Sequence, residues 1–247
     1  MNIDKILSED NQSLDLIAIK ESGNYSSAIP FPNIVIENFF NEEFLNKVLE
    51  EFPDLSEIEK SQKYQNKNEI KFANNDYSSF PESIKKFFDF LNSNNFLNFL
   101  QKLTSIKEEL VSDPELNGGG LHEIKRGGVL KIHTDFNRHP NLDLDRRLNI
   151  LIYLNKNWKK EYGGDLELWD KEMKNCKKKI SPNFNKMVIF STNDYSYHGH
   201  PEPVNCPVDF SRKSLALYYF SKGRPSYELD FKKIKNKTYF MDRQGFK

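Results

Sequence analysis

The sequence predicts a mainly β protein with an N-terminal helical layer, and three observations carry this prediction. Short apolar runs separated by turn residues follow one another from Gly118 onward, which favours a jelly-roll or barrel over a parallel α/β sheet. Apolar stripes of helical spacing precede these runs. The length of 247 residues suits one domain with a sizeable core. We therefore expect a single domain over 1–247, with an N-terminal strand and helices in 1–117, the β core in 118–222 and a C-terminal extension in 223–247.

The first expected elements are a strand and a helix. The run 33–40 is rich in β-forming residues, and Asn41 after it is a suitable N-cap with two acidic residues in the first turn that follows. The helix has an apolar stripe made of Phe44, Leu45, Val48, Leu49 and Phe52. Pro53 ends it. The polar stretch from there through Asp76 is expected to be mostly loop with a short strand.

Two more helices are expected before the β core. Pro81 suits a helix start. The first stripe consists of Ile84, Phe87, Phe88 and Leu91, and the second of Phe96, Leu97, Phe99, Leu100 and Leu103. Such stripes are typical of packing, so we expect these helices to cover one face of a sheet.

The β core is expected to contain about seven strands. Their ranges are 121–125, 129–136, 148–155, 165–169, 186–191, the segment around His198, and 214–220. The Gly127-Gly128 and Gly163-Gly164 pairs mark turns between them.

Charge and composition limit the partners and the compartment. The 36 basic and 36 acidic residues cancel, so no overall field would attract nucleic acid or an anionic membrane. No apolar run approaches the ~18 residues of a membrane span, and the N-terminus lacks the pattern of a signal peptide. Two cysteines provide no disulfide framework. We expect a cytoplasmic protein, and the basic tail from Phe231 is expected to be solvated surface.

His133 and Asp135 form the most informative motif. Side chains at i and i+2 of a strand leave the same face, so the two can bind one metal ion together. A set of two histidines and one carboxylate leaves coordination positions open, as an Fe(II) oxygenase requires. The pair His200 and Glu202 has the same spacing, but Pro201 makes that segment a strand end or a loop. The alternative interpretation is an ordinary surface pair on an edge strand.

The remaining site residues are expected further along the chain. His198 follows the apolar run 187–190 and is the favoured third ligand, with His200 as its rival. Arg212 and Ser214 share one strand face, where a guanidinium clamps a carboxylate through two hydrogen bonds and a hydroxyl adds a donor. His122 fits a packed or surface histidine better than a cavity residue. His139 is expected in a loop.

In this order, His133-x-Asp135, His198 and Arg212-x-Ser214 resemble the 2-oxoglutarate- and Fe(II)-dependent dioxygenases of the prolyl 4-hydroxylase group. The segment 147–158 followed by Gly163-Gly164 is similar to the third core strand and next turn of this family, and 31–39 resembles its opening segment. The resemblance covers roughly residues 30 to 225 and implies a double-stranded β-helix, which is a distorted jelly-roll.

The resemblance also implies roles for individual residues. His133, Asp135 and His198 would bind iron, and Arg212 would pair with the distal carboxylate of 2-oxoglutarate. Tyr153 matches a position whose hydroxyl helps to hold that carboxylate, although a core tyrosine would have the same pattern. Catalysis would take place at the metal centre, with no separate acid or base residue.

The implied function is hydroxylation of a peptidyl residue such as proline, with succinate and CO2 as co-products. Fe(II), 2-oxoglutarate and O2 are the expected cofactors and co-substrates, with ascorbate as an optional reductant. One alternative is hydroxylation of a small molecule, such as a free amino acid, a sugar derivative or a natural product. Another is a non-catalytic jelly-roll that binds metal or carbohydrate, which would have no need of Arg212 and Ser214 beside the metal.

Overall fold

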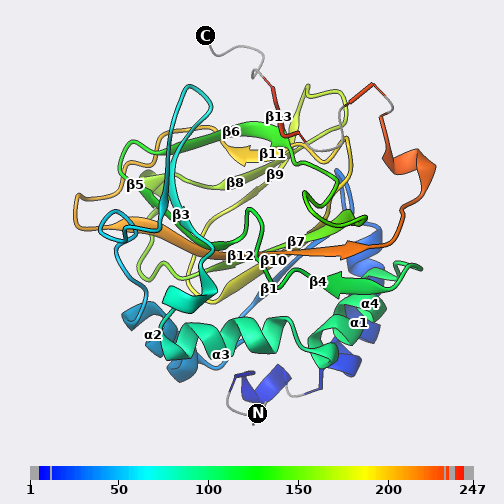
Figure 1. Cartoon of the computed structure of the whole chain (residues 1–247), viewed down its shortest axis with the longest axis horizontal. Helices are drawn as coiled ribbons and strands as arrows, with labels where there is room; N and C mark the ends of the chain where they lie inside the picture. The colour runs from blue at the N-terminus through cyan, green and yellow to red at the C-terminus, as the bar shows by residue number, and fades with distance from the viewer. Residues whose placement is uncertain (1–5, 12, 231, 234–236, 242–247) are drawn as a thin grey trace.

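The computed structural model describes residues 6–11, 13–230, 232–233 and 237–241. Its strands curl into two facing walls, and a layer of helices lies along the outer side of one wall (Figure 1). The mainly β fold with an N-terminal helical layer is therefore confirmed, and it has the form of a double-stranded β-helix. None of the helices in these residues is long and apolar enough to cross a membrane.

The helical layer consists of four α-helices, which are α1 (Leu14–Ser26), α2 (Glu42–Glu50), α3 (Glu82–Leu91) and α4 (Asn94–Thr104). Asn41 caps α2 as expected, because its side chain accepts a hydrogen bond from the backbone N–H of Phe44 at 2.9 Å. The expected helices at residues 42–52, 81–91 and 96–103 correspond to α2, α3 and α4. Helix α1 was not predicted, since its apolar residues form no single stripe: Leu16 and Ile19 are 68% and 71% exposed.

Thirteen strands make up the sheet in the described part of the chain. They are β1 (Asn33–Glu37), β2 (Gln62–Gln65), β3 (Glu69–Asn74), β4 (Leu110–Ser112), β5 (Gly120–Lys125), β6 (Val129–Thr134), β7 (Asp145–Tyr153), β8 (Leu166–Trp169), β9 (Cys176–Ile180), β10 (Lys186–Ser191), β11 (His198–His200), β12 (Ser211–Ser221) and β13 (Tyr239–Phe240). Short 3-10 helices lie at Glu9–Asn11, Tyr77–Ser79, Lys160–Tyr162 and Ser226–Glu228.

The strands run antiparallel in the order β1-β10-β7-β12-β5-β3-β6-β11-β8-β9, and β2, β4 and β13 add to it at β3, β12 and β6. Each of the seven expected strands is present. Three further strands (β4, β9 and β13) lie where none was expected, and the stretch through Asp76, where one short strand was expected, contains two, β2 and β3. Strand β9 was not predicted because three consecutive lysines show no apolar alternation. Lys177 and Lys179 are exposed at an outer face while the strand pairs with β8.

The hydrophobic core lies between the helices and the wall that contains β7, β10 and β12. Aromatic rings from both layers interlock there: the rings of Phe40 and Phe87 meet edge to face at 4.7 Å, and Phe96 lies 6.5 Å from Tyr219 of β12. The Tyr219 hydroxyl donates to the carbonyl of Leu91 at 2.8 Å. Burying one such ring contributes about 1.5–3 kcal/mol, so this layer holds the wall rigidly from outside. The opposite face of β7 and β12 is left for the site.

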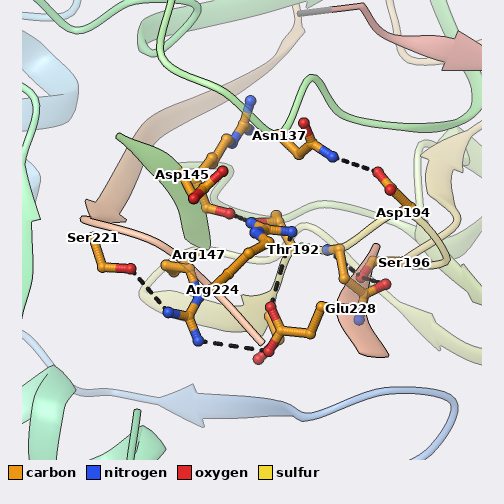
Figure 2. A network of polar contacts seen from close by, with 12 residues as sticks. Asn137, Asp145, Arg147, Thr192, Asp194, Ser196, Ser221, Arg224 and Glu228 are labelled. Atoms are coloured by element: carbon orange, nitrogen blue, oxygen red, sulfur yellow. Dashed lines mark hydrogen bonds and ion pairs between the residues drawn. The ribbon is translucent and has the colours of Figure 1, made fainter. Parts of the chain in front are cut away.

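A buried polar network fastens the C-terminal segment to this wall (Figure 2). Arg147 of β7 donates to Ser221 at 2.8 Å and to Glu108 at 2.7 Å, and it lies 3.5 Å from Glu228. Close by, the Asp194 carboxylate accepts hydrogen bonds from the Asn137 side chain and from the backbone N–H of residue 230, both at 2.5 Å. These contacts direct the chain after β12 back to β6, where β13 pairs with Thr134 and His133.

Candidate metal and co-substrate site

Three side chains converge at one end of the curled sheet. His133 lies near the end of β6, Asp135 follows that strand, and His198 opens β11 directly opposite His133. The Nε2 atoms of His133 and His198 lie 3.5 and 3.4 Å from the two carboxylate oxygens of Asp135. One ligand atom from each residue lies within 4.8 Å of the others. This is the spacing of a facial set around one divalent ion.

The backbone orients both imidazole rings. Nδ1 of His133 lies 2.8 Å from the carbonyl of Lys131, and Nδ1 of His198 lies 2.9 Å from that of Ser196. A proton on Nδ1 donated to each carbonyl leaves the Nε2 lone pairs facing the centre of the set, which is how histidines are held ready for a metal. The donor set therefore fits Fe(II).

Electrostatics keep the set in the protonation state that a metal needs. Burial is the largest single influence on the pKa of Asp135, and it raises that pKa. The combined effect of Arg146 and the two imidazoles is opposite and larger, so the pKa of Asp135 lies well below its usual range. Burial lowers the pKa of His198 to about 4 against the opposing effect of Asp135. At neutral pH the carboxylate is therefore charged and His198 is neutral, as metal binding requires.

Arg146 and Asn149 hold the Asp135 carboxylate from behind. The Arg146 guanidinium lies 3.1 Å from Asp135 Oδ2, and the Asn149 amide donates to the same oxygen at 2.8 Å. Arg146 in turn donates to Asn149 Oδ1 and packs over the ring of Tyr218, 3.3 Å from its centroid. Sequence reasoning missed Arg146. The register between β7 and β12 shifts beside it, at Tyr219 and Phe220, so strand alternation could not show that it faces the cavity.

Arg212 lies at the other end of the same cavity. Its Nε donates to the carbonyl of Gly164 at 2.8 Å and its Nη2 to the Tyr153 hydroxyl at 3.2 Å. Gly164 has φ +74°, and a Cβ there would lie 2.9 Å from Arg212 Cδ, so the turn leaves room for the arginine and for no side chain. Burial raises the pKa of Tyr153 despite the charge of Arg212. The hydroxyl thus stays protonated and fixes the guanidinium.

The cavity itself has a volume of about 200 Å³ and joins the two ends. Its lining includes His133, Asp135, His198, Arg212 and Ser214, so five of the six predicted site residues border one space. The sixth, Tyr153, contacts Arg212 but does not line the cavity, so its hydroxyl reaches the site through the guanidinium.

The other histidines are also located. His200 was expected at a strand end or in a loop and is the last residue of β11, where it lines the cavity. His122 was expected to be a packed or surface residue rather than a cavity residue. It is buried, but it also lines the cavity, so that part of the expectation was wrong. His139 lies in a loop, 3.4 Å from Asp113, away from the cavity. From the C-terminal segment, Phe240 adds a wall, with its ring 5.3 Å from that of His133.

Comparison with known proteins finds a family model that matches the part of the chain carrying the site. The family model of the 2OG-Fe(II) oxygenase superfamily matches residues 119–220, which include all six predicted site residues. The fold is similar to a prolyl hydroxylase from Trichoplax adhaerens in complex with a peptide fragment of the hypoxia inducible factor oxygen degradation domain, with TM-score 0.61, 18% identity, and coverage of 85% of this chain and 92% of that chain.

Two further structures share the fold. A prolyl 4-hydroxylase from Phytophthora capsici matches with TM-score 0.62 and 20% identity over 87% of this chain and 66% of its own. A Pseudomonas putida prolyl-4-hydroxylase matches with TM-score 0.59 and 11% identity over 84% of this chain and 100% of its own. Residues 119–220 thus match the 2OG-Fe(II) oxygenase superfamily, and the double-stranded β-helix and the His-Asp-His set agree with an Fe(II)/2-oxoglutarate-dependent dioxygenase.

Proposed function

We propose that this dioxygenase hydroxylates a peptidyl residue such as proline and converts 2-oxoglutarate to succinate and CO2 in the same turnover. The observation that carries the proposal is the single cavity that joins the His133, Asp135 and His198 set to Arg212. A metal set alone would suit many binding proteins. A buried arginine beside it has a use when a carboxylate co-substrate must be held next to the metal.

The proposed roles follow from the contacts. His133, Asp135 and His198 hold Fe(II), which supplies the O2-activating chemistry when bound. Arg212 pairs with the distal carboxylate of 2-oxoglutarate, and Ser214, on the same face of β12, supplies a hydroxyl donor. Tyr153 acts on that carboxylate through Arg212, whose Nη2 it holds at 3.2 Å.

Arg146 and Asn149 have a positioning role. Both contact Asp135 Oδ2, whereas Oδ1 has neither contact and lies 3.5 Å from Nε2 of His133. Partners that fix a metal-binding carboxylate in this way keep it in one orientation as the metal binds and is released. The aromatic rings of Phe136 and Tyr218 on either side of Arg146 exclude water from the pair.

The peptide substrate is supported by the surroundings of the cavity. Segments outside residues 118–222 contribute to its lining: Tyr64, Glu69 and Lys71 from the β2–β3 hairpin, and Thr238 and Phe240 at β13. An extended substrate can therefore meet two separate segments beside the metal. The structurally similar Trichoplax protein is a prolyl hydroxylase that was solved with a peptide bound.

The test is a substrate screen coupled to succinate formation. Wild-type protein with Fe(II) and 2-oxoglutarate is incubated with proline-containing peptides, free amino acids and sugar derivatives, and each is analysed for the gain of one oxygen atom. We expect peptides to stimulate succinate formation and to be hydroxylated, with Asp135→Ala as the inactive control. Stimulation by a small molecule alone would contradict the peptide proposal and favour the small-molecule hydroxylase.

A further inference from the structure

Two histidines outside the metal set face the same cavity with unpaired ring nitrogens. His200 is 2% exposed, and neither of its nitrogens has a hydrogen-bond partner among the residues that the structure describes. His122 is 9% exposed, and its Nε2 lacks a partner on the same basis. Buried polar atoms in proteins are nearly always hydrogen-bonded. Three unpaired nitrogens on two residues that line one cavity therefore point to a ligand in it.

The strand register places His122 beside the expected carboxylate site. His122 of β5 lies opposite Ser214 of β12, and Ser214 lies opposite Tyr153 of β7. Directly opposed residues in a sheet share a face, so these three side chains form one row across three strands. Arg212 is two residues from Ser214 on that face, opposite Ile124. The imidazole therefore lies next to the position that binds the distal carboxylate.

His200 reaches the same region from the facing wall. It follows His198 by two residues on β11, and both line the cavity. His122, His200 and Arg212 all line this one cavity. The two walls thus each contribute one imidazole to the cavity that Arg212 lines.

A second metal site does not account for these rings. Within the described ranges, His133, Asp135 and His198 are the one group of three whose ligand atoms converge. A positively charged arginine beside the two imidazoles also disfavours a cation. An imidazole N–H next to a guanidinium suits an anionic oxygen, which can accept several hydrogen bonds.

We propose that His122 and His200 donate hydrogen bonds to the distal carboxylate of 2-oxoglutarate, which is then held by Arg212, Ser214 and two imidazoles. The inference rests on the proposed function, because it takes Arg212 as the carboxylate site. Its consequence is selectivity: the two histidines favour a 2-oxo acid that ends in a carboxylate over one of equal length that ends in a methyl group.

The experiment compares two ligands that differ at that end. Calorimetric titration of the Mn(II)-loaded protein without O2 gives the affinities for 2-oxoglutarate and for 2-oxopentanoate, whose chain ends in a methyl group. We expect His200→Leu and His122→Leu each to weaken 2-oxoglutarate about tenfold while 2-oxopentanoate changes less than about twofold. His200→Gln, which keeps an N–H donor, should recover part of the loss. His139→Gln is the matched histidine control outside the cavity.

The ratio of the two affinities decides the outcome, and it does not change when part of a variant is unfolded. Equal losses for both ligands, or none, in the two leucine variants would overturn the inference. If Arg212→Ala abolishes the preference for 2-oxoglutarate and the histidine variants retain it, this inference fails and the proposed function stands. Wild-type protein without any preference for 2-oxoglutarate would refute both.

Discussion

Adding one methyl group at Gly164 tests whether the position of Arg212 controls co-substrate binding. A Cβ at Gly164 would lie 2.9 Å from Arg212 Cδ and 3.3 Å from Nε. The arginine cannot move aside freely, because it is buried and donates to the carbonyl of Gly164 and to Tyr153. Gly164→Ala must therefore displace the guanidinium or the turn that carries it.

The expected effect has two parts. At φ +74° an L-residue costs about 1–2 kcal/mol, which lowers the free energy of unfolding of Gly164→Ala. Displacing the guanidinium weakens its charged hydrogen bonds to the carboxylate, which contribute roughly 1.5–3 kcal/mol each. The loss of one such bond corresponds to an increase in the Kd for 2-oxoglutarate of roughly 10- to 150-fold.

Gly163→Ala separates the two parts. Gly163 also has a positive φ of +66°, but the nearest atom to its Cβ is the carbonyl oxygen of Pro203 at 3.7 Å. It therefore has the backbone cost without a contact to Arg212. Urea unfolding and calorimetric titration of the Mn(II)-loaded proteins measure both quantities. Equal 2-oxoglutarate affinities in the two variants would refute the reasoning about Arg212.

Three further predictions concern the metal set and the fold. Electron paramagnetic resonance titrations should show that Mn(II) binding is abolished in His133→Ala, Asp135→Ala and His198→Ala and is kept in His200→Ala. If His200→Ala lost Mn(II) binding and His198→Ala kept it, the third ligand would be His200. Asn149→Ala should weaken Mn(II) by about 10–100-fold, since it removes the 2.8 Å hydrogen bond that orients Asp135, and an unchanged affinity would argue against this role. Arg147→Met should lower the free energy of unfolding by roughly 3 kcal/mol, because it removes the buried guanidinium that contacts Glu108, Ser221 and Glu228, and an unchanged urea midpoint would contradict that.

The principal site residues could be predicted because each depends on local strand geometry. His133 and Asp135 are two residues apart at the end of a strand, and Arg212 and Ser214 share a face of β12 that opposes its core-facing residues. Alternation along a strand places such pairs without knowledge of the rest of the fold. His198 could then be predicted as the third ligand, because it follows a later apolar run that was expected to be a strand.

Other parts of the site depend on features that alternation cannot show. All of β5 except its last residue is buried, so its pattern gives no sign that His122 faces a cavity. Arg146 faces inward because the register shifts beside it. Phe240 reaches His133 only because β13 pairs with β6 across more than a hundred residues of sequence, and a two-residue strand has no pattern of its own.

The most direct test of the account uses metal-free protein under anaerobic conditions. Fe(II) and then 2-oxoglutarate are added, and the weak visible charge-transfer band of the chelated iron is recorded. We predict a band that is absent in His133→Ala and weaker in Arg212→Ala, as expected when these residues bind the metal and the co-substrate in one cavity. Folded, metal-bound protein that shows no band on addition of 2-oxoglutarate would contradict the account.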